Sequence, residues 1–259
     1  MAGLRTALRD GPPLVGAWLQ LESPMAAEIA GRLGFDWVGI DTQHGLIGYD
    51  GMLRMLQALS IGGTPALVRV PSAEPAAIGR ALDSGAAGVI VPLVETAEQA
   101  VTAVAACRYP PAGRRSWGPI RLALAGGYTP QEADRDVACI VMVETRRGAE
   151  AAAQIAAVEG VDGVLIGPSD LALSLGGAPT AALTDAVNAP FVRPIFDACA
   201  VAGVAVGAIA PSPAHVAAYL DAGCQLVSAY RDVQGMTAAA AEALAAARAA
   251  SGGRAPGAG

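Results

Sequence analysis

The chain has 259 residues, and all 17 of its Lys and Arg positions are arginine, so it contains no lysine. This excludes a Schiff-base lysine, and with it class I aldolase chemistry and pyridoxal phosphate (PLP) chemistry. With 23 Asp and Glu residues the net charge is −6, which argues against nucleic acid and an anionic membrane as partners.

Although 53% of the residues are hydrophobic, the pattern does not indicate a membrane protein. Gly, Pro or a charged residue interrupts every apolar run before the ~20 residues that a spanning helix needs. The segment Met1–Asp10 is charged and lacks the apolar core of a secretion signal, so we expect a cytoplasmic protein. Four scattered cysteines form no CxxC pair and are interpreted as small buried hydrophobic residues; they are Cys107, Cys139, Cys199 and Cys224.

Short β-branched runs alternate with longer alanine-rich segments along the chain. The predicted strands are Leu14–Leu21, Trp37–Asp41, Ala66–Val70, Gly88–Val94, Ala138–Glu144, Gly163–Gly167, Ala205–Ala210 and Leu226–Arg231. The predicted helices are Met25–Leu33, Gly51–Ser60, Pro75–Ser84, Ala97–Cys107, Gly148–Val158, Pro190–Ala202, Pro213–Ala222 and Gln234–Ala250. Apolar runs without strict alternation suit strands of a parallel sheet buried on both faces. These strand–helix units predict an α/β fold, a (β/α)8 TIM barrel, with a doubly wound sheet as the alternative.

We expect one barrel domain over residues 1–250 and a disordered tail over residues 251–259, which read SGGRAPGAG. Two connections, 108–135 and 175–189, are longer than a compact barrel needs, and such loops are more often functional than idle. The C-terminal helix, Met236–Ala250, is rich in alanine and has few large side chains. It is expected either to close the bottom of the barrel or to cross to a neighbouring subunit.

Ionisable side chains stand at the ends of four predicted strands. They are Asp41 with His44 after strand two, Arg69 in strand three, Glu144 at the end of strand five and Asp170 after strand six. In a (β/α)8 barrel the C-terminal ends of the strands and the loops that follow form the active site. We therefore expect these side chains to face one site.

Glu144 and Asp170 follow adjacent strands, so their carboxylates can bind one divalent cation. Hard oxygen ligands, with positions left for water, favour Mg2+, Mn2+ or Co2+ over zinc. The alternative is structural, with Asp170 capping the helix after Pro168 and Glu144 paired with an arginine such as Arg146.

His44 lies three residues after Asp41, and an aspartate can hold an imidazole in the tautomer of a general base. The alternative is that His44 only satisfies the loop backbone. Arg69 interrupts an apolar strand, and a buried guanidinium requires a carboxylate or a substrate anion. A structural ion pair with Asp41 or Glu144 is the alternative here, and His215 is interpreted as structural or as a surface residue.

Two segments offer groups that bind an anion. Gly167, Pro168, Ser169 and Asp170 open a helix, whose first backbone N–H groups are free to bind a carboxylate. The Gly- and Pro-rich loop 110–121 carries three arginines, which either reach an anionic substrate or stabilise an interface between subunits.

Six segments, in this order, resemble the HpcH/HpaI aldolases, a family of metal-dependent 2-keto-acid aldolases. They read FDWVGIDTQHG, LVRVP, ALDSGAAGVIVPLVETAEQA, YPPAGRRSWGP, VMVET and VDGVLIGPSDLALSLG. The resemblance extends from Trp18 to about Gly176. It implies a barrel like those of the phosphoenolpyruvate/pyruvate superfamily, assembled as a homo-hexamer (a trimer of dimers) with C-terminal helices exchanged between subunits.

The same resemblance implies catalytic roles for five residues. Glu144 and Asp170 would bind the divalent metal, Mg2+, Mn2+ or Co2+. Arg69 would stabilise the enolate oxygen of the substrate. His44, paired with Asp41, would handle the proton of the hydroxyl derived from the aldehyde.

Roles in substrate binding are also implied. The backbone amides of Ser169 and Asp170 would hold the keto-acid carboxylate, and Trp18 would line the pocket. The chain departs from the family at Gln43, where a glutamate is frequent, and at Met142, where some members carry glutamine. Gln43 removes one negative charge beside the site, which would alter either the organisation of water or metal there or the preference for an acceptor aldehyde.

These roles imply a class II aldolase that reversibly cleaves 4-hydroxy-2-oxo acids to pyruvate, or a related 2-oxo acid, and an aldehyde. The cation takes up enolate charge, which a lysine-free chain must place elsewhere than on a Schiff base. Candidate substrates include 4-hydroxy-2-oxoheptanedioate and 2-keto-3-deoxy sugar acids. One alternative is a citrate-lyase-like acyl-CoA lyase, which the absence of lysine for the CoA phosphates disfavours. Another is a non-catalytic keto-acid-binding barrel, which the retained catalytic positions disfavour.

Overall fold

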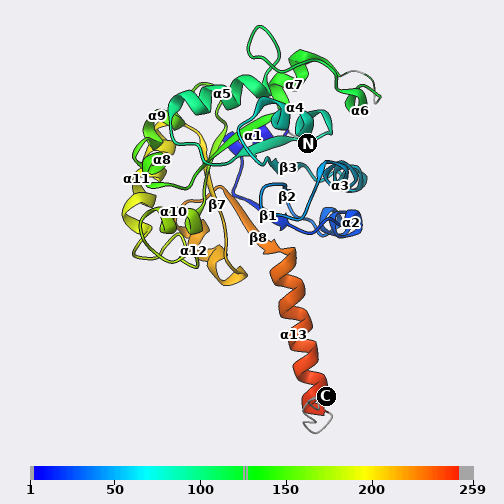
Figure 1. Ribbon diagram of the computed structural model, residues 1–259, viewed down its shortest axis with the longest axis vertical. Helices are drawn as coiled ribbons and strands as arrows, with labels where there is room; N and C mark the ends of the chain where they lie inside the picture. The colour runs from blue at the N-terminus through cyan, green and yellow to red at the C-terminus, as the bar shows by residue number, and fades with distance from the viewer. Residues whose placement is uncertain (1–2, 125, 127, 251–259) are drawn as a thin grey trace.

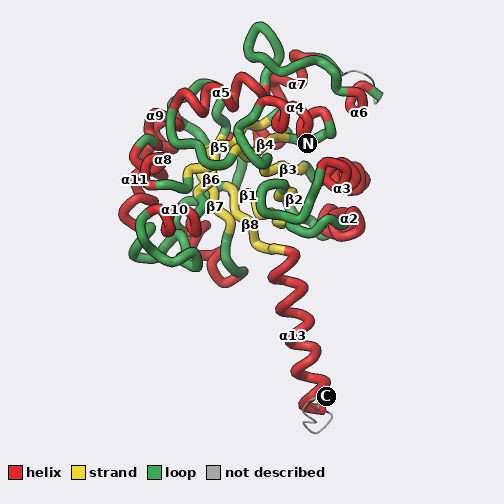
Figure 2. Tube along the Cα trace, in the orientation of Figure 1, coloured by secondary structure: helices red, strands yellow, loops and turns green. Residues whose placement is uncertain are grey.

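The computed structural model describes residues 3–124, 126 and 128–250 of the chain. Eight parallel strands pair in sequence order and close into a barrel, as Figure 1 and Figure 2 show. The strands are β1 (Leu14–Leu19), β2 (Trp37–Asp41), β3 (Ala66–Arg69), β4 (Gly88–Val91), β5 (Ala138–Val143), β6 (Gly163–Ile166), β7 (Ala205–Ile209) and β8 (Leu226–Arg231). The predicted (β/α)8 fold is confirmed, although several strands end earlier than predicted. The tail 251–259, which we expect to be disordered, lies outside the described residues.

Helices alternate with the strands and, apart from α1 and α13, pack around the barrel (Figure 2). They are α1 (Leu4–Asp10), α2 (Pro24–Arg32), α3 (Tyr49–Gly62), α4 (Pro75–Asp83), α5 (Ala97–Cys107), α6 (Ile120–Ala123), α7 (Pro130–Asp136), α8 (Arg146–Glu150), α9 (Ala152–Ala156), α10 (Pro168–Ser174), α11 (Ala189–Ala202), the 3-10 turn η1 (Pro213–His215), α12 (Val216–Asp221) and α13 (Asp232–Ala250). Their starts follow local sequence signals, since Ser23, Thr96, Thr129 and Thr145 each accept a backbone N–H bond as N-caps.

Three helical predictions differ from the structure in detail. The single helix predicted over Gly148–Val158 is two short helices, α8 and α9, which meet at Ala151. The helix predicted over Pro213–Ala222 begins with the turn η1. The long connection 108–135 is not structureless, because it contains α6 and most of α7.

The bottom of the barrel is closed by α1 and not by the C-terminal helix. Leu4 and Leu8, one turn apart on α1, are buried with barrel-interior residues such as Leu67 and Ile90. The expectation that the last helix closes the bottom is wrong. Helix α13 begins at Asp232, directly after β8, so no loop is present to carry it back to the N-terminal ends of the strands.

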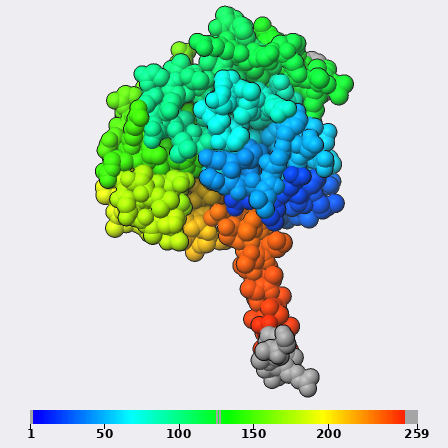
Figure 3. Space-filling model, in the orientation of Figure 1, coloured from blue at the N-terminus to red at the C-terminus, as the bar shows by residue number. Residues whose placement is uncertain are grey.

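Helix α13 instead projects from the barrel as a long isolated rod, visible in Figure 1 and Figure 3. Its residues from Met236 to Ala250 are exposed along the whole length, although most of them are alanine. Large apolar side chains are exposed as well, since Met236 is 58% and Leu244 51% accessible. An apolar helix in this position presents surface that a packing partner would cover.

None of the helices in the described part of the chain combines the length and the apolar character needed to span a bilayer. All four cysteines are buried and free, which confirms their interpretation as small hydrophobic residues.

Candidate active site

A cavity of about 450 Å³ opens at the C-terminal ends of the strands. It is lined by Trp18 and Gln20 from β1 and its following loop, His44, Arg69, Met142, Gly167–Asp170, Pro179–Ala181, Ile209, Pro211 and Arg231. Asp41 and Glu144 are almost completely buried, and each contacts a lining residue from behind. The structure therefore brings together all the predicted site residues, which come from five of the eight strands and the loops that follow them.

Strand alternation explains why these side chains point inward. Side chains two residues apart face the same side of a strand. Leu67 on β3 and Met142 on β5 belong to the cluster that fills the barrel interior, so Arg69 and Glu144, two residues further along the chain, also face inward. Trp18 packs against Gly39 of β2, where an added Cβ would lie 2.4 Å from the indole ring.

Arg69 and Asp41 form a buried ion pair on adjacent strands. The two residues are direct register partners. The Arg69 guanidinium donates from Nε to Asp41 Oδ1 at 2.9 Å and from Nη2 to Asp41 Oδ2. It also lies over the Trp18 ring, 5.2 Å from the centroid. Burial alone would raise the pKa of Asp41, but the hydrogen bonds and charge of Arg69 outweigh it and hold that pKa below its ordinary value.

The expected contact between the Asp41 carboxylate and the His44 imidazole is not formed among the described residues. Asp41 Oδ1 instead accepts the backbone N–H groups of Gln43 and His44, each at 3.1 Å. The pairing with Arg69 prevails because a buried guanidinium requires a counter-charge more strongly than an exposed imidazole does. His44 is exposed at the cavity and free to contact a bound molecule.

Glu144 is held in an unusual environment at the end of β5. Its Oε1 accepts the backbone N–H of Leu93 at 2.8 Å, while its buried Oε2 has no partner among the described residues. Leu93 adopts a φ of 55°, a conformation that is rare for a residue with a branched side chain. Strain at Leu93 thus accompanies the contact that orients this carboxylate.

The pKa of Glu144 is raised to about 7, chiefly by burial. The hydrogen bond from Leu93 opposes this rise, and the neighbouring carboxylate of Asp170 adds to it. Gly167 makes room beside the pair, since a Cβ there would lie 2.5 Å from Glu144 Oε2. The structural alternative, a pair between Glu144 and Arg146, is not observed in the described part of the chain.

This donor set fits a divalent cation. A buried carboxylate oxygen without a partner and a second carboxylate from the next strand end supply two hard oxygen ligands, and the cavity leaves room for a substrate or water to complete the shell. A cation would also remove the desolvation cost of ionising Glu144 beside Asp170.

Helix α10 places its first turn at the edge of the cavity. Pro168 at its start has a carbonyl that accepts the side-chain amide of Asn188 at 3.0 Å, which ties the turn to the following connection. The N–H groups of Ser169 and Asp170 lie in the first turn, where no intrahelical acceptor is available. Ser169 and Asp170 both line the cavity, so their free N–H groups are available to an anion there.

Two residues of the cavity escaped the sequence prediction. Gln20 donates from Nε2 to Asp41 Oδ2 at 3.2 Å and so supports the Arg69–Asp41 pair. Arg231, the last residue of β8, lines the cavity. The strand-end rule marks Arg231 as an ionisable candidate, but it does not show which face of the strand the side chain takes, because that depends on a register shift. Gln20 carried no comparable signal.

The other sequence candidates have structural roles in this chain. In the loop 110–121, Arg115 is buried, pairs with Asp83 at 2.8 Å and lies over the Tyr109 ring. Arg121 donates to the backbone oxygen of Ser84 at 2.6 Å. Neither arginine lines the cavity of its own chain. His215 contacts the Ser212 hydroxyl through Nδ1 at 3.0 Å, as a structural histidine would.

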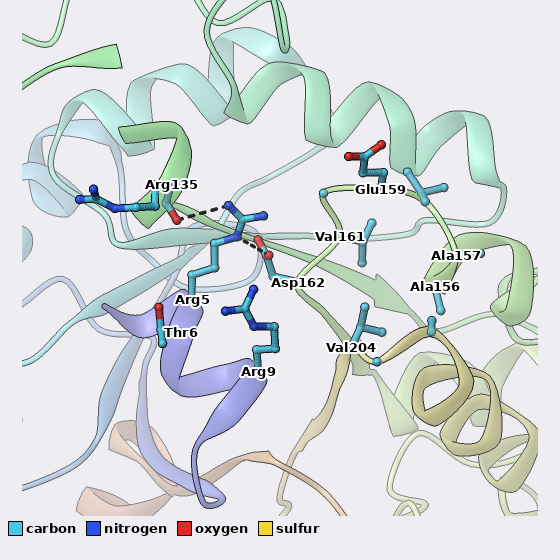
Figure 4. A pocket seen from close by; sticks show the side chains of 14 residues that line it. Arg5, Thr6, Arg9, Arg135, Ala156, Ala157, Glu159, Val161, Asp162 and Val204 are labelled. Carbon is cyan, nitrogen blue, oxygen red and sulfur yellow. Dashed lines mark hydrogen bonds and ion pairs between the residues drawn. The ribbon is translucent and has the colours of Figure 1, made fainter. Parts of the chain in front are cut away.

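A second cavity, of about 520 Å³, lies at the opposite end of the barrel between α1 and the N-terminal ends of β6 and β7 (Figure 4). Its arginines already have carboxylate partners. Arg5 pairs with Asp162 at 2.6 Å, and Arg9 and Arg135 pair with the aspartates that follow them in sequence. Because these charges are compensated, we place the active site at the C-terminal cavity.

The fold and this site define an enzyme of the (β/α)8 type whose chemistry uses paired carboxylates and a buried arginine. The chain belongs to the HpcH/HpaI aldolase/citrate lyase family, whose model matches residues 14–249. Enzymes of this family are generally dependent on a divalent metal.

Individual relatives agree with this assignment. The chain is 38% identical over 251 residues to a hydroxypyruvate/pyruvate aldolase of Rhizorhabdus wittichii. The matched region covers 96% of this chain and 100% of that relative. It is 36% identical to a 5-keto-4-deoxy-D-glucarate aldolase of Klebsiella pneumoniae, with 88% and 90% covered. A crystal structure of a family protein from Burkholderia cenocepacia matches with a TM-score of 0.88 at 36% identity, covering 95% of this chain and 98% of that one. The chain is accordingly a class II aldolase, a carbon–carbon lyase.

Proposed function

We propose that this enzyme reversibly cleaves 4-hydroxy-2-oxo acids to pyruvate, or a closely related 2-oxo acid, and an aldehyde. The observation that carries the proposal is the buried Oε2 of Glu144 beside Asp170, which has no hydrogen-bond partner in the described structure, in a cavity that also presents Arg69. This combination supplies a cation site and a second positive group at one reacting centre. Mg2+, Mn2+ and Co2+ are the proposed cations.

In this scheme the substrate is oriented by groups from four strand ends. Its carboxylate lies against the N–H groups of Ser169 and Asp170, with Trp18 forming the wall of the pocket. Glu144 and Asp170 would hold a divalent cation, which would supply Lewis-acid polarisation of the C2 carbonyl when bound. Arg69 donates hydrogen bonds to the C2 oxygen as negative charge develops there.

His44 is the proposed acid–base group. In the cleavage direction it accepts the proton of the C4 hydroxyl, directly or through a water, as the C3–C4 bond breaks and the aldehyde leaves. The remaining enolate takes a proton at C3 to give the 2-oxo acid. Asp41 acts indirectly, because its carboxylate holds both Arg69 and the backbone N–H of His44 in place.

We expect exhaustive chelation with EDTA to abolish pyruvate release from 4-hydroxy-2-oxo acids, and Mg2+, Mn2+ or Co2+ to restore it. The reason is that Arg69 alone cannot take up the full enolate charge. A coupled assay of pyruvate over a panel of 4-hydroxy-2-oxo acids, with each metal in turn, measures the effect. It also ranks the substrates.

Activity that survives chelation contradicts the proposed cation. Cleavage of acyl-CoA substrates, with no response to free 2-oxo acids, would instead favour the acyl-CoA lyase reading. Binding of 2-oxo acids without any turnover would favour a non-catalytic barrel.

We further propose that α13 packs against another copy of the chain in a homo-hexamer, a trimer of dimers. The support is the exposed, alanine-rich surface of this helix, with Met236 and Leu244 uncovered. Light scattering should therefore give wild-type protein a mass several times that of the 25.8 kDa chain. Replacing both Met236 and Leu244 with aspartate should reduce this mass, because two charges cannot be buried at the interface.

A control is Val201→Asp, at an apolar position on α11 that is still more exposed, with 91% accessibility. Its oligomeric mass should be that of the wild type. A monomeric wild type, or a double variant of unchanged mass, contradicts the proposal.

The cytoplasm is the compartment that we propose for this enzyme. Four free, buried thiols are typical of proteins from a reducing compartment.

A further inference from the structure

The last strand of the barrel directs an arginine into the active-site cavity because its alternation is interrupted. Ser228 is buried in the barrel, so regular alternation would place Tyr230 on the inner face. The pairing of β8 with β1 shifts by one residue between Gly16 and Ala17, which makes Arg231 the partner of inward-facing Trp18. Tyr230 consequently lies outside, and Arg231 lines the cavity. Bulges of this kind re-aim side chains next to active sites.

Arg231 has no carboxylate partner among the described residues. Its Nη2 donates to Gln20 Oε1 at a long 3.4 Å, and its Nε is buried without a partner. The adjacent Asp232 is occupied, since its carboxylate accepts the N–H groups of Gln20, Leu21 and Val233. A partly buried guanidinium with unused donors is costly unless an anion reaches it.

The electrostatic surroundings of Arg231 also favour the binding of an anion. Burial lowers the pKa of Arg231, and repulsion from Arg69 lowers it further. Asp41 is already bound by Arg69 through both of its oxygens. The cavity thus holds two guanidinium groups, of which Arg69 forms an ion pair with a carboxylate, whereas Arg231 forms none among the described residues.

The position of Arg231 indicates which part of a substrate it meets. Glu144 and Asp170 follow β5 and β6, whereas His44 and Arg231 come from the β2 end and from β8, around the rest of the rim. In the proposed reaction the 2-oxo acid lies beside the carboxylates, so the aldehyde half extends toward His44 and Arg231. A guanidinium offers a planar fork of donors that matches the two oxygens of a carboxylate.

We propose that Arg231 binds a carboxylate on the aldehyde half of the substrate, and that the enzyme therefore prefers aldehydes that carry a carboxylate over neutral ones. This inference rests on the proposed aldol reaction. Arg231 would thus determine which aldehyde is accepted, whereas Arg69 assists the cleavage of the bond.

The test compares aldehydes that differ only in this charge. Addition of pyruvate to 4-oxobutanoate is measured against butanal, and addition to glyoxylate against acetaldehyde, for wild type, Arg231→Met and Arg231→Lys. In at least one pair, the wild-type kcat/KM for the aldehyde with a carboxylate should exceed that for the neutral aldehyde by tenfold or more. Arg231→Met should lose about 10- to 100-fold in kcat/KM for that acid, mainly through KM, because a charge-assisted hydrogen bond is lost. Its rate with the neutral aldehyde should stay within about twofold, and Arg231→Lys should fall between.

Arg193→Met is the matched control, because Arg193 is an exposed arginine on α11 that pairs with Asp197. It should behave as wild type with every aldehyde. Equal losses for acid and neutral aldehydes in Arg231→Met would overturn the proposal and indicate a structural role or a carboxylate supplied by a second copy of the chain. A wild type without preference for either acid would also overturn it.

A second measurement does not depend on catalysis. Calorimetry compares succinate with butyrate, which cannot react, on the metal-loaded protein. Wild type should bind succinate at least tenfold more tightly than Arg231→Met does, with no such difference for butyrate. If no aldehyde gives product, the proposed function fails, and the succinate result still decides whether Arg231 binds a carboxylate.

Discussion

Replacing Arg69 with alanine is expected to lower kcat for pyruvate release by about 100- to 1,000-fold, the usual effect of removing one preorganised donor to a developing oxyanion. Arg69 is 5% exposed and is fixed from two sides, by the Asp41 carboxylate and by the Trp18 ring. It is therefore oriented before substrate arrives. Steady-state rates at saturating cation measure the loss.

The same substitution leaves Asp41 buried without its cation, which should also destabilise the fold by about 3 to 5 kcal/mol. Thermal unfolding and circular dichroism must accompany the rates, so that lost folding is not mistaken for lost catalysis. Arg69→Lys keeps the charge and should recover stability more than activity, because a lysine lacks the two-pronged contact. Arg80→Ala is the matched control, since Arg80 likewise lies over an aromatic ring, that of Tyr49, at 4.4 Å, but outside the site. Folded Arg69→Ala protein with a near-normal kcat would refute this role.

The barrel was predictable because most of its strands are buried on both faces. A parallel strand between core and helices reads as a short apolar run such as GVLI of β6, and the following helix repeats the unit. The direction of α13 could not be predicted from the sequence. Its alanine-rich sequence suits either packing on the barrel or packing on another chain, and only the absence of a loop between Arg231 and Asp232 removes the first choice.

The positions of the site residues were predictable, but several of their contacts were not. Strand ends with ionisable residues identified Asp41, Arg69 and Glu144 correctly as neighbours of one cavity. Sequence spacing suggested that Asp41 supports His44, whereas cross-strand register gives Asp41 to Arg69. Spacing along a chain does not encode which of two side chains pairs with a carboxylate, because that depends on burial.

Two features depended on backbone geometry that residue patterns do not reveal. The positive φ of Leu93 directs its N–H onto Glu144, although leucine carries no signal for that conformation. The register shift in β8 exchanges the orientations of Tyr230 and Arg231. Since a slip of one residue reverses the two faces of a strand, correct strand boundaries alone would have placed the tyrosine in the cavity.

The geometry of the site explains how the enzyme can work without a lysine. A lysine-free aldolase must distribute enolate charge over other positive groups, and the cavity offers a buried arginine beside a pair of carboxylates suited to a cation. In the resulting site, the buried carboxylate of Glu144 lacks an ion-pair partner among the described residues until the cation binds.

Glu144→Gln is accordingly expected to abolish the response to cations and, at the same time, to stabilise the cation-free protein at high pH. Burial raises the pKa of Glu144 from its ordinary 4.5 to about 7, so the folded state binds this proton more tightly than the unfolded chain does. The contribution of Glu144 to the free energy of unfolding is therefore fully present below about pH 4.5. It is lost as the pH rises to about 7, by about 3 kcal/mol in all. Glutamine carries no charge to desolvate, and its oxygen can still accept the N–H of Leu93.

Urea unfolding in EDTA at pH 5 and pH 8 measures this difference. The variant should exceed wild type at pH 8 and differ far less at pH 5. Added Mn2+ should raise the stability of wild type at pH 8 by preferential binding to the folded state, and should leave the variant unchanged. Glu150→Gln, at an exposed position on α8, should reproduce wild type in every condition. A variant that is less stable than wild type at pH 8, or one that Mn2+ still stabilises, would show that Glu144 is held as a structural carboxylate and not for a cation.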